Sequence, residues 1–82
     1  MNTDPDRKIL EAAALCSIAD ARAALEAESH RDEASKRLSE SAALSLEISM
    51  KSAEFHLKLG NVLRLKGEVE ILHLRLSTYQ GR

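Results

Sequence analysis

The chain has 82 residues and a net charge of −1, with 12 lysines and arginines against 13 aspartates and glutamates. This balance lacks the basic footprint of nucleic-acid-binding proteins, and no uncharged stretch approaches the roughly 18 to 20 residues that cross a bilayer. A chain this short buries only about 60% of its unfolded surface, so a second subunit would add stability. The single cysteine, Cys16, cannot form an internal disulfide, and the polar N-terminus has no signal-peptide pattern. We therefore expect a cytoplasmic protein.

The composition is typical of long helices. Alanine, leucine, glutamate, lysine and arginine supply 46 of the 82 residues, with one proline and three glycines. We predict an all-α fold in one small domain, a helical hairpin or three-helix arrangement with a coiled-coil-like C-terminal helix. The expected elements are a helix over about 5–28, a polar connection over about 29–35, and helical structure over 36–79 with a possible break at 60–61.

Start and stop signals set these limits. Thr3 or Asp4 can cap a first helix, with Pro5 at its first position. That helix contains eight alanines between residues 7 and 28, so it can approach another helix closely. Ser29 with Asp32 suggests a cap for the next helix, for which Ser35 and Ser39 are alternative starts. The glycine in Gly60-Asn61 suits a helix C-terminus, because glycine adopts the left-handed conformation at little cost.

A seam of apolar residues runs through the last third of the chain. The spacing from Val62 to Tyr79 alternates between three and four residues, which is the rhythm of a coiled-coil heptad. Valine at position a with leucine at d favours a two-stranded coil. We expect a dimer in which Glu68 of one copy meets His73 of the other. The expected interface residues are Phe55, Val62, Leu65, Val69, Leu72, His73, Leu76 and Tyr79.

A second apolar stripe lies on the opposite side of the same region. At helical spacing, one face of residues 44–59 carries Leu44, Ile48, Phe55 and Leu59, and the opposite face carries Leu46, Met50, Ala53 and Leu57. A helix that is apolar on two sides must be covered on both. We expect the alanine-rich first helix to cover the second of these stripes and another subunit to cover the remaining face.

An alternative fold follows from the same residues. Apolar and polar residues alternate from 44 to 50 and again from 53 to 59, which also fits two paired strands. This interpretation predicts an α+β protein with an antiparallel β-meander from about 43 to 77. Leucine is not a residue that strands favour, and Lys51-Ser52 is a poor hairpin turn because neither residue readily takes a positive φ. The helical interpretation is therefore preferred.

Catalytic and metal-binding motifs are absent from the sequence. The three histidines form no i, i+4 pair, and His30 with Glu33 is the only close spacing that suggests a metal site. Cys16 lies in an alanine-rich apolar run, which predicts a buried structural thiol. The serines occur without the motifs of nucleophilic catalysis or phosphate binding. We expect no enzymatic activity, no cofactor and no metal.

These features favour a non-enzymatic protein–protein interaction module that forms a homodimer or larger homo-oligomer through its C-terminal seam. Such a module acts as an adaptor, a small chaperone or a regulator by presenting helix surface to a protein partner. One alternative is an obligate subunit of a hetero-complex. Another is a small dimeric regulator that binds nucleic acid, although the charge balance argues against it. Its candidate contacts are Arg7, Lys8, Arg22, Arg31, Lys36 and Arg37.

Overall fold

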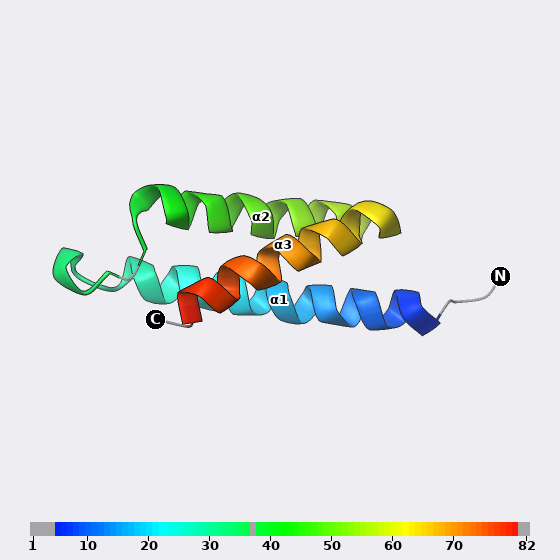
Figure 1. Ribbon diagram of the computed structural model, residues 1–82, viewed down its shortest axis with the longest axis horizontal. Helices are drawn as coiled ribbons and strands as arrows, with labels where there is room; N and C mark the ends of the chain where they lie inside the picture. Colours follow the sequence, from blue (N-terminus) through cyan, green and yellow to red (C-terminus); the bar gives the residue numbers. More distant parts are fainter. Residues whose placement is uncertain (1–4, 37, 81–82) are drawn as a thin grey trace.

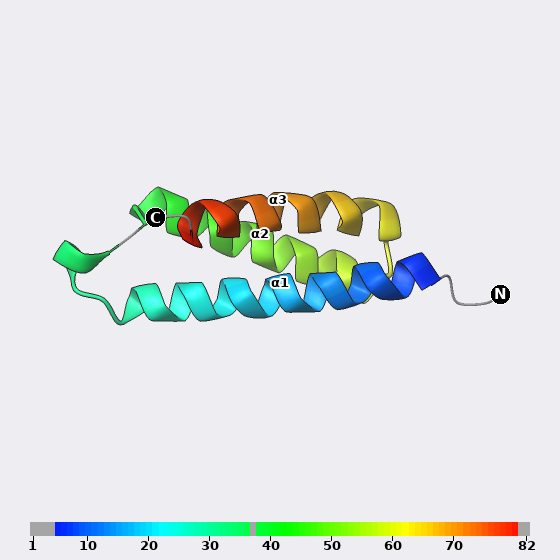
Figure 2. The ribbon, with the colours of Figure 1, turned by 60° about the horizontal axis from the view of Figure 1, so that its bottom comes forward.

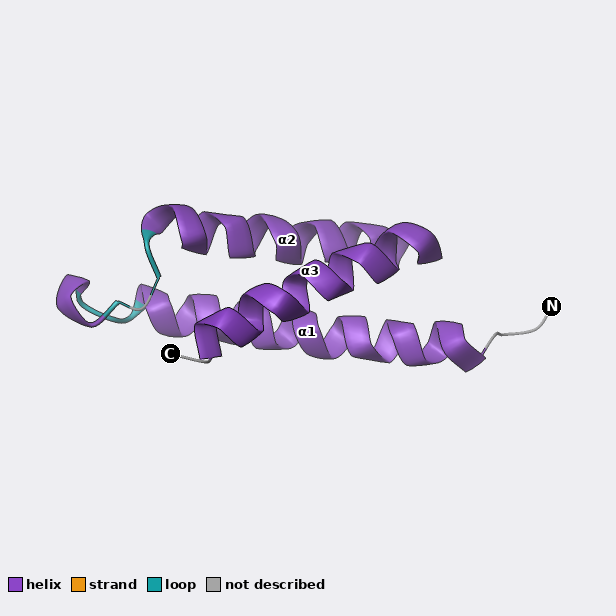
Figure 3. Ribbon diagram, in the orientation of Figure 1, coloured by secondary structure: helices purple, strands orange, loops and turns teal. Residues whose placement is uncertain are grey.

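The computed structural model describes residues 5–36 and 38–80, and these residues form three α-helices. The helices are α1 (Pro5–Ser29), α2 (Glu40–Leu59) and α3 (Val62–Gln80), with a short 3₁₀ helix, η1 (Glu33–Ser35), between α1 and α2 (Figures 1 and 3). The all-α prediction is confirmed. The predicted caps Thr3 and Asp4 lie outside the described residues.

The alternative β-meander over 43–77 is wrong. No strand occurs in the described residues, and helix α2 continues without interruption through Lys51 and Ser52, where the meander needed its first turn. The physical reason is that neither residue favours the positive φ of a tight hairpin. Leucine-rich segments also gain more from helical packing than from strand pairing.

Each helix packs against both of the others. Helices α1 and α2 run in opposite directions, and α3 returns along both of them, parallel to α1 and antiparallel to α2 (Figures 1 and 2). The result is an elongated bundle with extents of 52 × 19 × 17 Å. A bundle this narrow has a core one side chain deep, so every helix keeps a broad outer face.

Small side chains form much of the buried face of α1. Ala14, Ala21 and Ala24 are buried there together with Ser17 and Ile18. Alanines let the other helices approach closely, as the sequence predicts. The predicted buried thiol is wrong, because Cys16 is exposed. Alanines occur on both the buried and the exposed sides of this helix, so an apolar run around a residue does not reveal which face that residue occupies.

The core lies between this face of α1 and the apolar seam of α3. Along α3, Leu65, Val69, Leu72, Leu76 and Tyr79 are buried at regular heptad spacing. Helix α2 contributes one of its two predicted stripes to the same core, with Leu46, Met50 and Ala53 buried and Leu57 partly buried. This stripe packs against α1, as expected for that part of the pattern.

A tight turn at Gly60 joins α2 to α3. Gly60 has φ 72°, the left-handed conformation, and its amide donates to the carbonyl oxygens of His56 and Leu57. The amide of Asn61 also donates to the His56 carbonyl, at 3.1 Å. The side chain of Asn61 then accepts from the amide of Arg64, at 3.3 Å, which caps the start of α3. The turn therefore lies at the 60–61 position where the sequence suggests a break.

The connection between α1 and α2 is longer than the predicted 29–35. Helix α2 begins at Glu40 because Ser39 serves as its N-cap, its hydroxyl accepting from the amide of Ala42 at 3.1 Å. Upstream, Asp32 caps η1 and accepts from both the hydroxyl and the amide of Ser35. These two hydrogen bonds, the one from the hydroxyl first, hold the pKa of Asp32 below its usual value.

The Leu72→Ala variant tests how much the buried core contributes to stability. Leu72 is fully buried, so its truncation leaves a cavity, and we expect a loss of about 2 to 5 kcal/mol in the free energy of unfolding. Leu74→Ala is the matched control, since Leu74 lies on the same helix but is 68% exposed, and we expect a change within about 0.5 kcal/mol. Urea unfolding followed by circular dichroism measures both. Equal losses would contradict this placement of α3.

Replacing Gly60 or Gly67 by alanine should change the free energy of unfolding in opposite directions. Gly60→Ala places a Cβ on a left-handed residue, so we expect a loss of roughly 1 kcal/mol. Gly67→Ala adds a Cβ into open space on α3 and removes backbone freedom from the unfolded chain. We therefore expect a gain of about 0.5 to 1 kcal/mol. Thermal unfolding of both variants tests the turn, and stabilisation by Gly60→Ala would contradict it.

Candidate interaction surface

The predicted dimer seam lies inside the chain. Of the eight residues expected at an interface with a second subunit, five are buried between α3 and the other two helices. A second copy cannot reach them while α3 remains packed on α1 and α2. The remaining three are half-buried or exposed. The five buried residues are Leu65, Val69, Leu72, Leu76 and Tyr79, and the other three are Val62, His73 and Phe55.

The expected partner of His73 is engaged elsewhere. Glu68 faces α2, where its Oε2 accepts a hydrogen bond of 2.6 Å from the hydroxyl of Ser52. The Nδ1 of His56 lies 3.9 Å from the same carboxylate oxygen. His73 is exposed on α3. Glu68 therefore links α3 to α2 within one chain, and the residue that sequence reasoning missed is His56.

The Ser52, His56 and Glu68 cluster contains the residue types of a catalytic triad, but its geometry is different. In a triad the histidine accepts the proton of the serine hydroxyl. Here that hydroxyl donates to the carboxylate, and the Nδ1 of His56 donates to the backbone carbonyl of Ser52 at 2.9 Å. The arrangement is that of a structural polar contact between two helices.

Helix α2 carries a row of exposed apolar side chains, which we call the outer face of α2. The row consists of Leu44, Ile48, Phe55 and Leu59, whose side chains are 57 to 62% exposed. Helix α2 lies along one edge of the bundle (Figure 1), and these four side chains lie on its exposed side. Sequence reasoning identified it as one of two apolar faces. Which of the two is covered depends on how α3 folds back, and the sequence pattern does not contain that information.

Charged residues line one flank of the outer face. Glu47, Lys51, Glu54 and Lys58 follow one another at helical spacing on the flank of α2 nearest α1. Lys51 contacts Glu47 at 3.2 Å within the helix, and Glu54 pairs with Arg22 of α1. The opposite flank, nearest α3, carries Ser45, Ser52 and His56, and the last two lie against Glu68 of α3.

A groove of about 500 Å³ lies on another side of the bundle, between the start of α2 and the end of α3. Ile71 and Leu74 of α3 line it and are partly exposed. Leu38, Ala42, Leu46 and Tyr79 also line it. These side chains offer no charged group beyond Arg75, so the groove is suited to apolar contacts.

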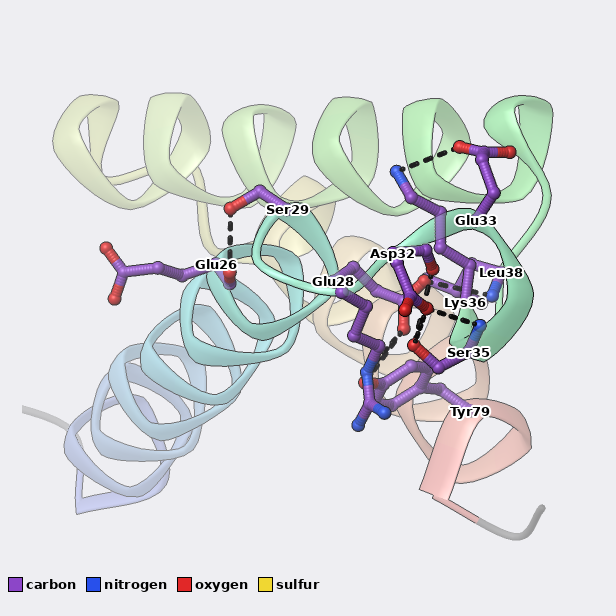
Figure 4. A network of polar contacts seen from close by, with 10 residues as sticks. Glu26, Glu28, Ser29, Asp32, Glu33, Ser35, Lys36, Leu38 and Tyr79 are labelled. Carbon is purple, nitrogen blue, oxygen red and sulfur yellow. Dashed lines mark hydrogen bonds and ion pairs between the residues drawn. The ribbon is translucent and has the colours of Figure 1, made fainter.

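A buried polar network holds the start of α2 in place (Figure 4). Glu28, at the end of α1, is only 5% exposed. Its carboxylate accepts from the amide of Leu38 at 3.1 Å and from the hydroxyl of Tyr79 at 3.5 Å, and it contacts Nε of Arg31 at 3.1 Å. One carboxylate therefore ties together α1, the connection that leads to α2, and α3.

The basic residues considered for nucleic acid do not form a common surface. Arg7, Arg22, Arg31 and Lys36 each pair with a glutamate of the same chain. They also extend from near the start of α1 to the far end of the elongated bundle (Figure 1). Lys8 is exposed on α1, and Arg37 lies outside the described residues.

Neither a metal-binding cluster nor a membrane-spanning helix occurs in the described residues. No group of three histidine, cysteine, aspartate or glutamate side chains is arranged to hold a metal ion. Within the same residues, none of the helices has the length and apolarity needed to span a bilayer. Comparison with known protein families, curated proteins and solved structures yields no match for this chain.

Glu28→Ala should cost about 1 to 3 kcal/mol in the free energy of unfolding, because it leaves buried donors without their acceptor. Glu33→Ala is a matched control. Both glutamates pair with a cation three residues later, but the Glu33 side chain is 95% exposed and that of Glu28 only 6%. We expect the control to change stability by less than about 0.5 kcal/mol. Denaturant unfolding compares them, and similar values would show that the network does not anchor α2.

Proposed function

We propose that this chain is a non-enzymatic protein–protein interaction module that binds a helix of another polypeptide through the outer face of α2. The observation that carries the proposal is the set of four large apolar side chains aligned on this face and more than half exposed. Contiguous apolar patches on soluble proteins mark sites of association. An amphipathic helix is the partner that suits a row of apolar anchors at this spacing.

The energetic argument follows from burial. Complete burial of a leucine, isoleucine or phenylalanine side chain contributes about 1.5 to 3 kcal/mol. Each of the four side chains on the outer face still has more than half of its surface to bury. Together they offer roughly 3.5 to 7 kcal/mol from this side of the contact, and the apolar side chains of the partner must supply the rest of what offsets the cost of lost motion.

The outer face is also accessible without rearrangement. A partner that contacts Leu65 or Leu72 must first separate α3 from α1 and α2, which exposes the chain's own core. A partner that contacts Ile48 leaves that core intact. The expected self-association therefore fits the outer face of α2 better than the seam of α3. The same face also accommodates a subunit of different sequence.

Photo-crosslinking in cells that make the protein tests this proposal. A benzophenone amino acid at Ile48 or Phe55 should form covalent adducts with a protein, whether another copy or a different chain, because the face is covered in the complex. The same amino acid at Lys66, on the exposed side of α3, is the control. We expect at least fivefold more adduct from the α2 sites.

Adduct formation no greater at Ile48 and Phe55 than at Lys66 would contradict the proposal. Circular dichroism of the purified variants must show unchanged helicity, since both α2 side chains are largely exposed. A loss of helicity would show that the face contributes to the fold and not to an interface.

A further inference from the structure

We infer that the groove between the start of α2 and the end of α3 binds a fatty acid, with the apolar chain along the groove and the carboxylate on Arg75. None of the four side chains of the outer face of α2 lines this groove, so the inference goes beyond the proposed function and does not rest on it. Three observations carry it. They are the volume of the groove, its apolar lining, and one arginine to which the fold supplies no acidic partner.

The size of the groove favours a small ligand over a protein. Its volume of about 500 Å³ lies within the range of roughly 300 to 1,000 Å³ that is usual for ligand pockets. On α3 its lining extends from Ile71 to Tyr79, about 12 Å along the helix axis. A stable protein interface buries about 800 Å² on each partner, which is more than a groove of this length offers. A slender molecule is the better fit.

The lining is apolar along most of the groove. Leu38, Ala42 and Leu46 belong to the connection and α2, and Ile71 and Leu74 belong to α3. Leu46 is buried, whereas Ile71 and Leu74 are 46% and 68% exposed. A ligand that covers the last two removes their apolar surface from water, which favours binding. An acyl chain has no polar group to satisfy, so this surface meets all of its requirements.

Arg75 is the one charged side chain of the groove, and it selects the charge of the ligand. The residues three and four positions away on α3 are not acidic, and no ion pair joins Arg75 to another described residue. Three of the other arginines, by contrast, pair with a glutamate of the same chain. A guanidinium group binds a carboxylate through two parallel hydrogen bonds, so Arg75 can receive the acidic end of a ligand.

The two hydroxyl groups of the groove already donate their protons within the chain. The hydroxyl of Thr78 donates to the carbonyl oxygen of Leu74 at 3.1 Å, and that of Tyr79 donates to Glu28 at 3.5 Å. The donors that remain for a ligand are therefore those of Arg75. A cationic ligand is repelled by this side chain, and a neutral one gains nothing from its charge. An apolar chain with a single negative end complements the whole groove.

Titration of the ¹⁵N-labelled chain with sodium decanoate, near neutral pH and below the concentration at which decanoate forms micelles, tests the inference by NMR. We expect a dissociation constant on the order of 1 mM or tighter. The largest amide shifts should occur at Ala42, Ile71, Leu74 and Thr78, which line the groove. Decyltrimethylammonium carries a chain of the same length with the opposite charge and should bind at least tenfold more weakly.

Two pairs of variants separate the charge from the apolar contact. Arg75→Gln should weaken decanoate binding at least fivefold and remove the preference over decyltrimethylammonium, whereas Arg64→Gln, outside the groove on the same helix, should leave both unchanged. Leu74→Asp should weaken decanoate binding at least tenfold, and Leu63→Asp should not. These two leucines are 68% and 86% exposed, so the unfolding curves of both variants should match that of the natural chain.

An absence of amide shifts in the natural chain would overturn the inference, and so would shifts centred on Ile48 and Phe55 of the outer face of α2. Equal binding of the anionic and cationic amphiphiles, or an Arg75→Gln variant that binds decanoate as tightly as the natural chain does, would show that Arg75 does not receive the carboxylate.

Discussion

The constraint on which the structure depends is that α3 has one strongly apolar side and a very short connection to α2. The turn at Gly60 brings Leu65, Val69 and Leu72 back over α2 and α1 before another chain can reach them. A short linker makes the local concentration of the attached helix far higher than that of a free one. The heptad rhythm is therefore satisfied within one chain. Once α3 occupies that position, α2 has only one side left for a partner.

The alanine content of α1 sets how much of the bundle is covered. A helix whose buried face consists largely of Ala14, Ala21 and Ala24 fits closely into the space between α2 and α3. The narrow cross-section of the bundle follows from these small side chains.

The sequence is sufficient to predict the helices. It is insufficient to predict which helix faces are buried within the chain and which remain exposed. Heptad spacing located the seam of α3, and the two stripes of α2 separated correctly into opposite faces. Periodicity describes which residues share a face, however, and does not say which chain supplies the covering helix. The predicted dimer contacts at Leu65 and Leu72 were placed between chains for that reason. The prediction of a buried Cys16 fails for a related reason, because alanines on both the buried and the exposed sides of α1 remove the contrast that marks a buried face.

The polar contacts could not be read from spacing at all. Glu28 reaches Leu38 and Tyr79, and Glu68 reaches Ser52, only after the three helices are assembled. These contacts bind the ends and the middle of the bundle to one another, so they stabilise the arrangement that leaves the outer face of α2 free. A surface held in this way needs no ordering when a partner arrives, which lowers the entropic cost of association.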